Sequence, residues 1–300
     1  MIVVYPPTTS WGRFFQRPQH IMQQFARNGW TAIFCDTRGH KFEEVEDNLF
    51  VTSDYDATLK YLGAQKADLL YATWAKTHNW ADKADTVLYD RVDSFSQWDK
   101  YEKSMLDVAD YVITTSKTLL NRGEHYVPNA CDENRIVRPG QAMQVAGGVP
   151  PLPGKVVGFS GAIGTWVDKS IIHDVSLSYS TLVLGSDKQI GKAYNLGHVP
   201  YKYIHLYYNL MDVGLIPFDN SRPAMNACPI KMYEYLAAGL EIVSTDIPEV
   251  RDLGNLVHIS DNFVDTISNL TYGKQWEKYK FSKANTWKVR YEQIKEILNG

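Results

Sequence analysis

The sequence predicts an α/β protein built of two Rossmann-like domains that face each other across a cleft. Short apolar runs of strand length alternate with segments of helical spacing, and this alternation occurs twice along the 300 residues. Such alternation is typical of a mostly parallel sheet with helices on both faces. Residues 139–154 are rich in Gly and Pro, which indicates a linker between the two series. We therefore expect an N-terminal domain over 1–145 and a C-terminal domain over 146–300.

The first half begins directly with a strand-like run and contains five such runs. The predicted strands are 2–5, 30–35, 67–71, 86–89 and 111–115. A helix is predicted over 17–28, closed by Gly29, and a charge-rich helix over 98–109.

The second half repeats the pattern. The predicted strands are 155–159, 181–184, 213–218, 241–244 and 256–259, and the predicted helices are 167–177, 201–210, 229–238 and 275–298. Pro229 suits the first helical position and Gly239 suits a left-handed turn that ends the helix. We expect the last helix to pack back over the junction between the domains.

The composition indicates an ordinary globular protein. Hydrophobic residues make up 44% and charged residues 22% of the chain, and the net charge of −3 provides no general attraction for nucleic acid or anionic membranes. The three cysteines are far apart, without metal-binding spacing, which favours a reducing compartment. There is no leader-like start and no apolar run near the ~18 residues of a membrane span. We therefore expect a cytoplasmic protein.

The segment 226–245 carries the strongest chemical signal. Together with the apolar run 213–218 just upstream, it predicts a strand–loop–helix–strand unit in which Lys231 and Glu234 leave the same face near the helix start. A helix start attracts anions, so a lysine there suits a diphosphate, and a carboxylate one turn deeper suits a sugar diol. The alternative is a surface pair worth roughly 0.2–0.5 kcal/mol.

The sequence of this segment closely resembles the nucleotide-sugar segment of bacterial glycosyltransferases of the GT-B fold. The residues that carry the resemblance are Pro-Ile-Lys-Met-Tyr-Glu-Tyr-Leu-Ala-Ala-Gly followed by Ile-Val-Ser-Thr. It is most similar to the cell-wall and exopolysaccharide branch, such as the teichuronic-acid type. The resemblance implies that Glu234 binds the ribose of a nucleotide sugar and that Lys231 lies beside the phosphates. Many retaining members have a second glutamate where this chain has Asn226, which slightly favours inversion here.

Two further segments resemble donor-binding parts of that family. Gly161, Ala162 and Ile163 follow a strand, where small residues let backbone N–H groups approach a phosphate. Related enzymes often have an arginine in this loop, and Lys169 is a candidate substitute or a solvent-facing residue. The second segment, 195–201, resembles the part beside the nucleobase, which points to His198, Val199 and Tyr201. Plain strand-to-helix turns remain the alternative for both.

The first loop of the N-terminal half also resembles the family, whose loop faces the cleft. Trp11, Arg13 and Arg17 are candidates for binding an acceptor or phosphate group, although Arg17 at a helix start also suits the surface. His20 is a candidate catalytic group, with a structural role as the alternative. Asn129, in a segment similar to the family's Pro-Asn-Gly, is a candidate cleft or turn residue.

A general base must take the proton of the attacking hydroxyl. Asp93, and next Asp90, follow a buried strand and match a Tyr-Asp-x-x-Asp segment of relatives, with helix capping as the alternative. Asp54 and Asp56 form an Asp-x-Asp pair of the kind that holds a divalent metal in other glycosyltransferases, but so short a pattern arises often by chance.

These observations predict a glycosyltransferase that moves a sugar from a nucleotide sugar, most simply a UDP-sugar, to an acceptor hydroxyl without a metal or other cofactor. The resemblance suggests a glycan acceptor. A second possible acceptor is a hydroxymethylated base of phage DNA, which would need a basic track around Arg13, Arg17 and Arg38. The same architecture also suits an epimerase-like or phosphorylase-like enzyme, or a non-catalytic module that binds a sugar nucleotide. The sequence does not define the oligomeric state.

Overall fold

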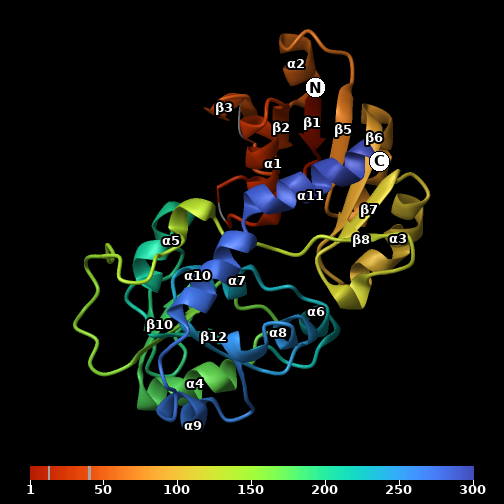
Figure 1. Ribbon diagram of the computed structural model, residues 1–300. Helices are drawn as coiled ribbons and strands as arrows, with labels where there is room; N and C mark the ends of the chain where they lie inside the picture. Colours follow the sequence, from red (N-terminus) through yellow and green to blue (C-terminus); the bar gives the residue numbers. More distant parts are fainter. Residues whose placement is uncertain (13, 40–41) are drawn as a thin grey trace. The chain divides into compact units, whose positions relative to one another are not determined.

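The computed structural model describes residues 1–12, 14–39 and 42–300, and it confirms the α/β class with two mostly parallel sheets (Figure 1). Contacts divide the chain into two compact units, Met1–Asn129 with Trp287–Gly300, and Ala130–Thr286. The first unit thus ends before residue 145, and the last helix belongs to it.

The first unit contains an eight-stranded sheet with the order β3-β4-β2-β1-β5-β6-β7-β8. The strands are β1 (Ile2–Tyr5), β2 (Thr31–Cys35), β3 (Glu43–Glu46), β4 (Leu49–Thr52), β5 (Ala67–Ala72), β6 (Ala84–Arg91), β7 (Tyr111–Thr114) and β8 (His125–Tyr126). All neighbours pair in parallel except β3 with β4. The five predicted strands are confirmed, whereas β3, β4 and β8 were not predicted.

The helices of this unit are α1 (Arg17–Arg27), α2 (Tyr55–Tyr61), α3 (Asp99–Leu106) and α11 (Trp287–Asn299). Helix α11 packs on α1, where the ring of Tyr291 meets the ring of Phe25 edge-on at 5.2 Å between centroids. Gly29 adopts a positive φ of 86° after α1, as its predicted role as a helix stop requires.

The second unit contains a six-stranded parallel sheet with the order β11-β10-β9-β12-β13-β14. The strands are β9 (Val156–Ser160), β10 (Ser180–Leu184), β11 (Tyr194–Asn195), β12 (Val213–Ile216), β13 (Glu241–Ser244) and β14 (His258–Ile259). The helices are α4 (Lys169–Ser178), α5 (Tyr201–Tyr208), α6 (Arg222–Met225), α7 (Ile230–Ala237), α8 (Pro248–Arg251), α9 (Phe263–Ser268) and α10 (Gln275–Ala284). The strand order reverses between β9 and β12, which is the point where open α/β sheets bind ligands.

The predicted terminal helix over 275–298 is wrong in one respect, because it is two helices. Helix α10 ends before Asn285, whose backbone leaves the helical region and whose carbonyl accepts a bond from the Cys131 N–H at 3.0 Å. Thr286 forms a bridge with Cys131, so the chain leaves the second unit beside the segment that entered it.

The segment 139–154 contains no helix or strand, as its Gly and Pro content predicts. It lies inside the second unit, where the Ala146 N–H donates to the Leu206 carbonyl at 3.0 Å. This contact ties the segment to α5, and the segment is a loop of the second unit rather than the predicted linker between two domains.

Gly214 in β12 is required by the packing of α7. A Cβ at this position would lie 2.3 Å from Cδ2 of Tyr235, so Gly214→Ala should cost about 1–3 kcal/mol of stability. Gly147→Ala is the matched control, because a Cβ there meets nothing within 4 Å and its φ is negative or extended. Thermal unfolding of both variants tests this, and equal midpoints would contradict it.

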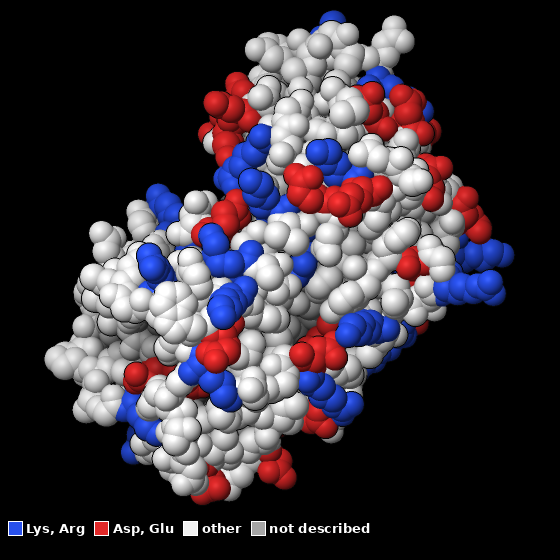
Figure 2. Space-filling model, viewed as in Figure 1, with Lys and Arg blue, Asp and Glu red and all other residues white. Residues whose placement is uncertain are grey.

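On the face shown in Figure 2, Lys and Arg side chains are interspersed with Asp and Glu side chains. Within the described residues, no helix is both long and apolar enough to cross a membrane.

Candidate functional site

The loops at the carboxyl ends of β9 and β10 are held together by glycines. Gly161 has a φ of +124°, and a Cβ on Gly185 would lie 2.5 Å from the Gly161 carbonyl oxygen, so the two loops touch through backbone alone. The Gly161 N–H is bonded to the Leu184 carbonyl at 2.9 Å. In the described part of the chain, the next two N–H groups, of Ala162 and Ile163, have no hydrogen-bond partner. These two groups, rather than Gly161 itself, are free to bind a phosphate.

Lys231 points its ammonium group toward this loop from the first turn of α7. The helix begins at Ile230, with Pro229 as its N-cap, one position later than predicted. Nζ of Lys231 lies 3.4 Å from the place a Gly161 Cβ would occupy, and 5.1 and 4.8 Å from the ring centroids of Phe159 and Phe218. Burial lowers the pKa of Lys231 to about 8, although Glu234 opposes the shift. The residue is a cation at the switch point of the sheet.

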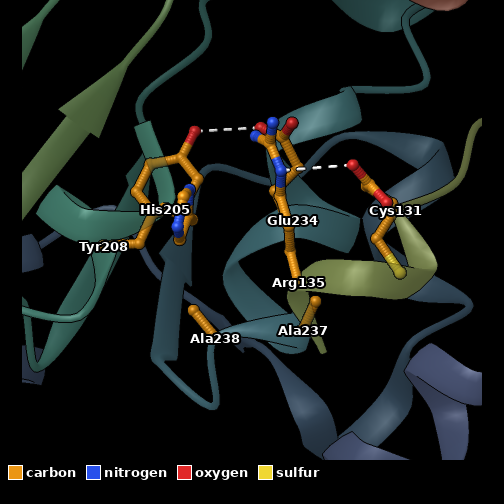
Figure 3. A pocket seen from close by; sticks show the side chains of 8 residues that line it. Cys131, Arg135, His205, Tyr208, Glu234, Ala237 and Ala238 are labelled. Carbon is orange, nitrogen blue, oxygen red and sulfur yellow. Dashed lines mark hydrogen bonds and ion pairs between the residues drawn. The ribbon is translucent and has the colours of Figure 1, made fainter. Parts of the chain in front are cut away.

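Glu234 lies one turn further along α7 and is half-buried. Its Oε2 accepts a hydrogen bond from the Tyr208 hydroxyl at 2.9 Å (Figure 3). Burial raises the pKa of this carboxyl, while Tyr208, Arg135, Tyr201 and Lys231 all act to lower it. Glu234 is therefore an oriented carboxylate.

A small pocket lies beside Glu234 in the second unit. It is narrow and partly open to solvent, and it is lined by Cys131, Asp132, Arg135, His205, Tyr208, Glu234, Ala237 and Ala238 (Figure 3). Arg135 pairs with Asp132 at 3.2 Å, and its guanidinium carbon lies 3.7 Å from the centroid of the Tyr201 ring. Ala237 and Ala238 have small side chains, so space remains beside the polar side chains that line the pocket.

The other predicted donor residues are spread around this region. His198 is exposed, and Val199 is half-buried against the core. Tyr201 begins α5, and the Arg135 guanidinium covers one face of its ring. That face is not available for stacking on a base, so His198 retains the stronger claim to that role. Lys169 is exposed at the start of α4.

In the first unit, Arg17 is not a surface residue. It is 2% exposed and its Nε donates to Oδ2 of Asp90, which is fully buried, at 2.5 Å. Tyr71 donates to the same oxygen at 2.6 Å, and the Arg17 Nη1 reaches the Asn129 side-chain oxygen at 3.3 Å. Burial raises the pKa of Asp90, and Arg17 and Tyr71 oppose this. The predicted residues Arg17, Asp90 and Asn129 thus form one buried network, which suits a supporting role.

Asp93 differs from Asp90 in being partly exposed after the end of β6. Burial and the Asp90 carboxylate raise its pKa to about 7. Within the described residues it has no hydrogen-bond or ion-pair partner. A carboxylate with this pKa and an open side is suited to accept a proton near neutral pH.

The remaining candidates of the first unit have packing roles, apart from one that the structure does not describe. His20 is 3% exposed, stacked on Trp287 at 4.6 Å and edge-on to Phe15 at 4.8 Å, which favours the structural interpretation. Trp11 packs on Phe34, and its backbone N–H donates to Oδ2 of Asp36 at 3.2 Å. Arg13 lies outside the described residues.

The Asp-x-Asp pair has a structural explanation. Asp54 is the N-cap of α2 and accepts a hydrogen bond from the Ala57 N–H at 2.9 Å, and Asp56 lies in the first turn. Among the described residues, no group of three or more His, Cys, Asp or Glu side chains is arranged to hold a metal ion.

Three residues, two in the second unit and one in the first, were missed by sequence reasoning. Tyr208, Arg135 and Tyr71 contact the predicted residues from distant parts of the chain. The spacing of apolar residues around them indicates only that their side chains face inward. It does not predict which side chain each of them contacts.

The chain has the GT-B fold, as the comparisons with solved structures show. Sucrose-phosphate synthase from Thermosynechococcus elongatus matches with a TM-score of 0.73 at 12% identity, over 99% of this chain and 98% of that one. Anabaena HepE, solved with UDP and glucose, matches with a TM-score of 0.66 at 11% identity, over 99% of both chains. A trehalose-6-phosphate structure from E. coli, bound with UDP-2-fluoro glucose, matches with a TM-score of 0.65 at 10% identity, over 99% and 98%.

Among curated proteins, the chain is similar to TuaH of Bacillus subtilis (strain 168), whose name describes a glycosyltransferase of teichuronic acid biosynthesis. The two are 29% identical over 109 residues, which cover 32% of this chain and 28% of TuaH. No family model matches the chain. The predicted resemblance to glycosyltransferases of the GT-B fold is thus confirmed at the level of similarity.

Proposed function

We propose that the protein is a glycosyltransferase that transfers a sugar from a nucleotide diphosphate sugar to an acceptor hydroxyl. The observation that carries this is the convergence of Lys231, the free N–H groups of Ala162 and Ile163, and Glu234 at the switch point of the second sheet. The GT-B fold and the similarity to TuaH support it. Two of the matched structures contain UDP or a UDP-sugar, which supports UDP as the nucleotide.

In this proposal, the second unit binds the donor. The Lys231 ammonium and the backbone N–H groups of Ala162 and Ile163 bind the diphosphate, and Glu234 accepts hydrogen bonds from the ribose diol. As the bond between the sugar and the diphosphate breaks, negative charge grows on the leaving oxygen, and Lys231 stabilises it. Fixed positive groups of the protein perform this stabilisation, so we propose that the reaction requires no metal.

The first unit supplies the base. Asp93 takes the proton of the acceptor hydroxyl as its oxygen forms a bond to the anomeric carbon. Asn226 donates its side-chain N–H to the Arg222 carbonyl at 2.8 Å, and an amide there cannot act as a carboxylate nucleophile. We therefore favour inversion of configuration and a glycan acceptor, in line with the name of TuaH.

A hydroxymethylated DNA base is less well supported as the acceptor. The required basic track would include Arg17, but this residue is buried and paired with Asp90. Arg38 is exposed, and the face in Figure 2 mixes both signs of charge.

The donor assignment is tested by thermal shift of the protein with UDP, GDP, TDP and their glucose conjugates. We expect UDP to raise the melting temperature, and Glu234→Ala to remove that increase because the ribose loses its acceptor. Asp246→Ala is the control, because Asp246 is exposed and its ion pair with Arg251 lies on the surface. Stabilisation by no nucleotide would overturn the proposal, and stabilisation retained by Glu234→Ala would overturn the role of Glu234.

A further inference from the structure

Tyr208 connects Glu234 to the strand that carries the glycine loop. Its side chain is 2% exposed, and its hydroxyl lies 2.7 Å from Oγ of Ser160 and 2.9 Å from Oε2 of Glu234. Burial, with the Glu234 carboxylate next, raises the pKa of Tyr208 well above its usual value. The hydroxyl therefore keeps its proton, which it donates to the carboxylate, while its oxygen is free to accept from Ser160.

Ser160 is itself held from two sides. It is the last residue of β9, and its N–H donates to the Tyr235 hydroxyl at 2.9 Å. The rings of Tyr208 and Tyr235 meet edge-on at 5.3 Å between centroids. The carboxylate of Glu234 is thus joined, through a buried hydroxyl, to the residue that directly precedes Gly161.

A ribose diol makes two hydrogen bonds to one carboxylate only when that carboxylate has a suitable rotation. An ionised carboxylate offers about four lone-pair sites, and Tyr208 uses one of them on Oε2. Tyr201 also lowers the pKa of Glu234 through a hydrogen bond to this carboxylate. The lone pairs that remain are then held at fixed positions, whereas the terminal torsion of an unrestrained glutamate is broad. A carboxylate held in this way rejects a sugar that lacks one hydroxyl, since a buried acceptor site is left unpaired.

We propose that Tyr208 is a positioning residue that orients the Glu234 carboxylate and so makes the donor site selective for ribonucleotides over 2′-deoxyribonucleotides. This inference rests on the proposed function, because it assumes that Glu234 meets the ribose. Tyr208 acts through Glu234 and does not touch the donor.

The test compares the binding of UDP and 2′-deoxy-UDP by isothermal titration calorimetry. We expect the unaltered protein to bind UDP about tenfold or more tightly than 2′-deoxy-UDP, from one hydrogen bond to a charged group. Tyr208→Phe should reduce this ratio to within about twofold, by weakening UDP and leaving 2′-deoxy-UDP nearly unchanged. Tyr203→Phe, the same change at an exposed tyrosine of α5, should keep the ratio.

A second readout is the pH dependence of UDP binding. Removal of the Tyr208 hydroxyl raises the pKa of Glu234 further, so Tyr208→Phe should lose affinity at a higher pH on acidification than the unaltered protein. A role confined to packing would not move this profile. If circular dichroism shows that Tyr208→Phe does not fold, Ser160→Ala takes its place. This variant keeps the Tyr208 hydroxyl but removes the hydrogen bond that holds it, so we expect an intermediate ratio of UDP to 2′-deoxy-UDP affinity.

The outcomes separate the two proposals. No binding of UDP by the unaltered protein overturns the donor assignment and this inference with it. A different outcome overturns this inference alone: UDP binding requires Glu234, but Tyr208→Phe keeps the ribose selectivity and the pH profile of the unaltered protein. The same holds for Ser160→Ala where it replaces Tyr208→Phe and is folded.

Discussion

Lys231→Met is expected to lower kcat/KM by about a hundredfold or more, the loss observed when one charge-stabilising group is removed from a transition state. The ammonium lies beside Gly161, at 5.1 and 4.8 Å from the ring centroids of Phe159 and Phe218, so no other side-chain cation of this loop takes its place. Steady-state kinetics with a UDP-sugar and the acceptor found by screening would measure this. Lys169→Met is the control, because Lys169 is exposed at the start of α4.

The charge of Lys231 also predicts an alkaline limit. Its pKa of about 8 means that kcat/KM falls as the pH rises through 8, because the neutral amine no longer stabilises the diphosphate. Lys231→Arg keeps the charge and should move this limit to higher pH. Activity of Lys231→Met within twofold of the unaltered protein would contradict the assignment.

Asp93→Asn is expected to lower kcat by about 10²–10⁴-fold, the usual contribution of a general base. The carboxyl has a pKa of about 7, so the base is active above pH 7 and kcat/KM falls as the pH drops through 7. With Lys231, this predicts a maximum between about pH 7 and 8, and Asp93→Asn should remove the acidic limb. Asp107→Asn, at an exposed position after α3, is the control.

A binding-only module would give a different result. Asp93→Asn would then leave UDP binding intact, and no transfer would be detected in the unaltered protein with any acceptor. Transfer that persists at full rate in Asp93→Asn, with its acidic limb unchanged, would show that another group accepts the proton.

The sequence predicted most of the sheet and helix pattern because the signals for it are local. Buried parallel strands appear as continuous apolar runs, and Gly29 and Gly239 adopt the positive φ that ends a helix. Strand β3 was missed because Glu43–Glu46 is acidic and lies at a sheet edge, where no apolar run is needed. The break at Asn285 was missed because both flanking segments have helical spacing.

The site residues also divide into those with a local sequence signal and those whose role depends on distant segments. The sequence by itself determined that Lys231 and Glu234 share one face near a helix start, since positions three residues apart on a helix are neighbours. Only the tertiary structure decided that Arg17 is buried against Asp90, that His20 is stacked on Trp287, and that Tyr208 binds Glu234. The physical reason is that spacing and turns depend on adjacent residues, whereas burial and charge pairing depend on segments that meet only after the chain has folded.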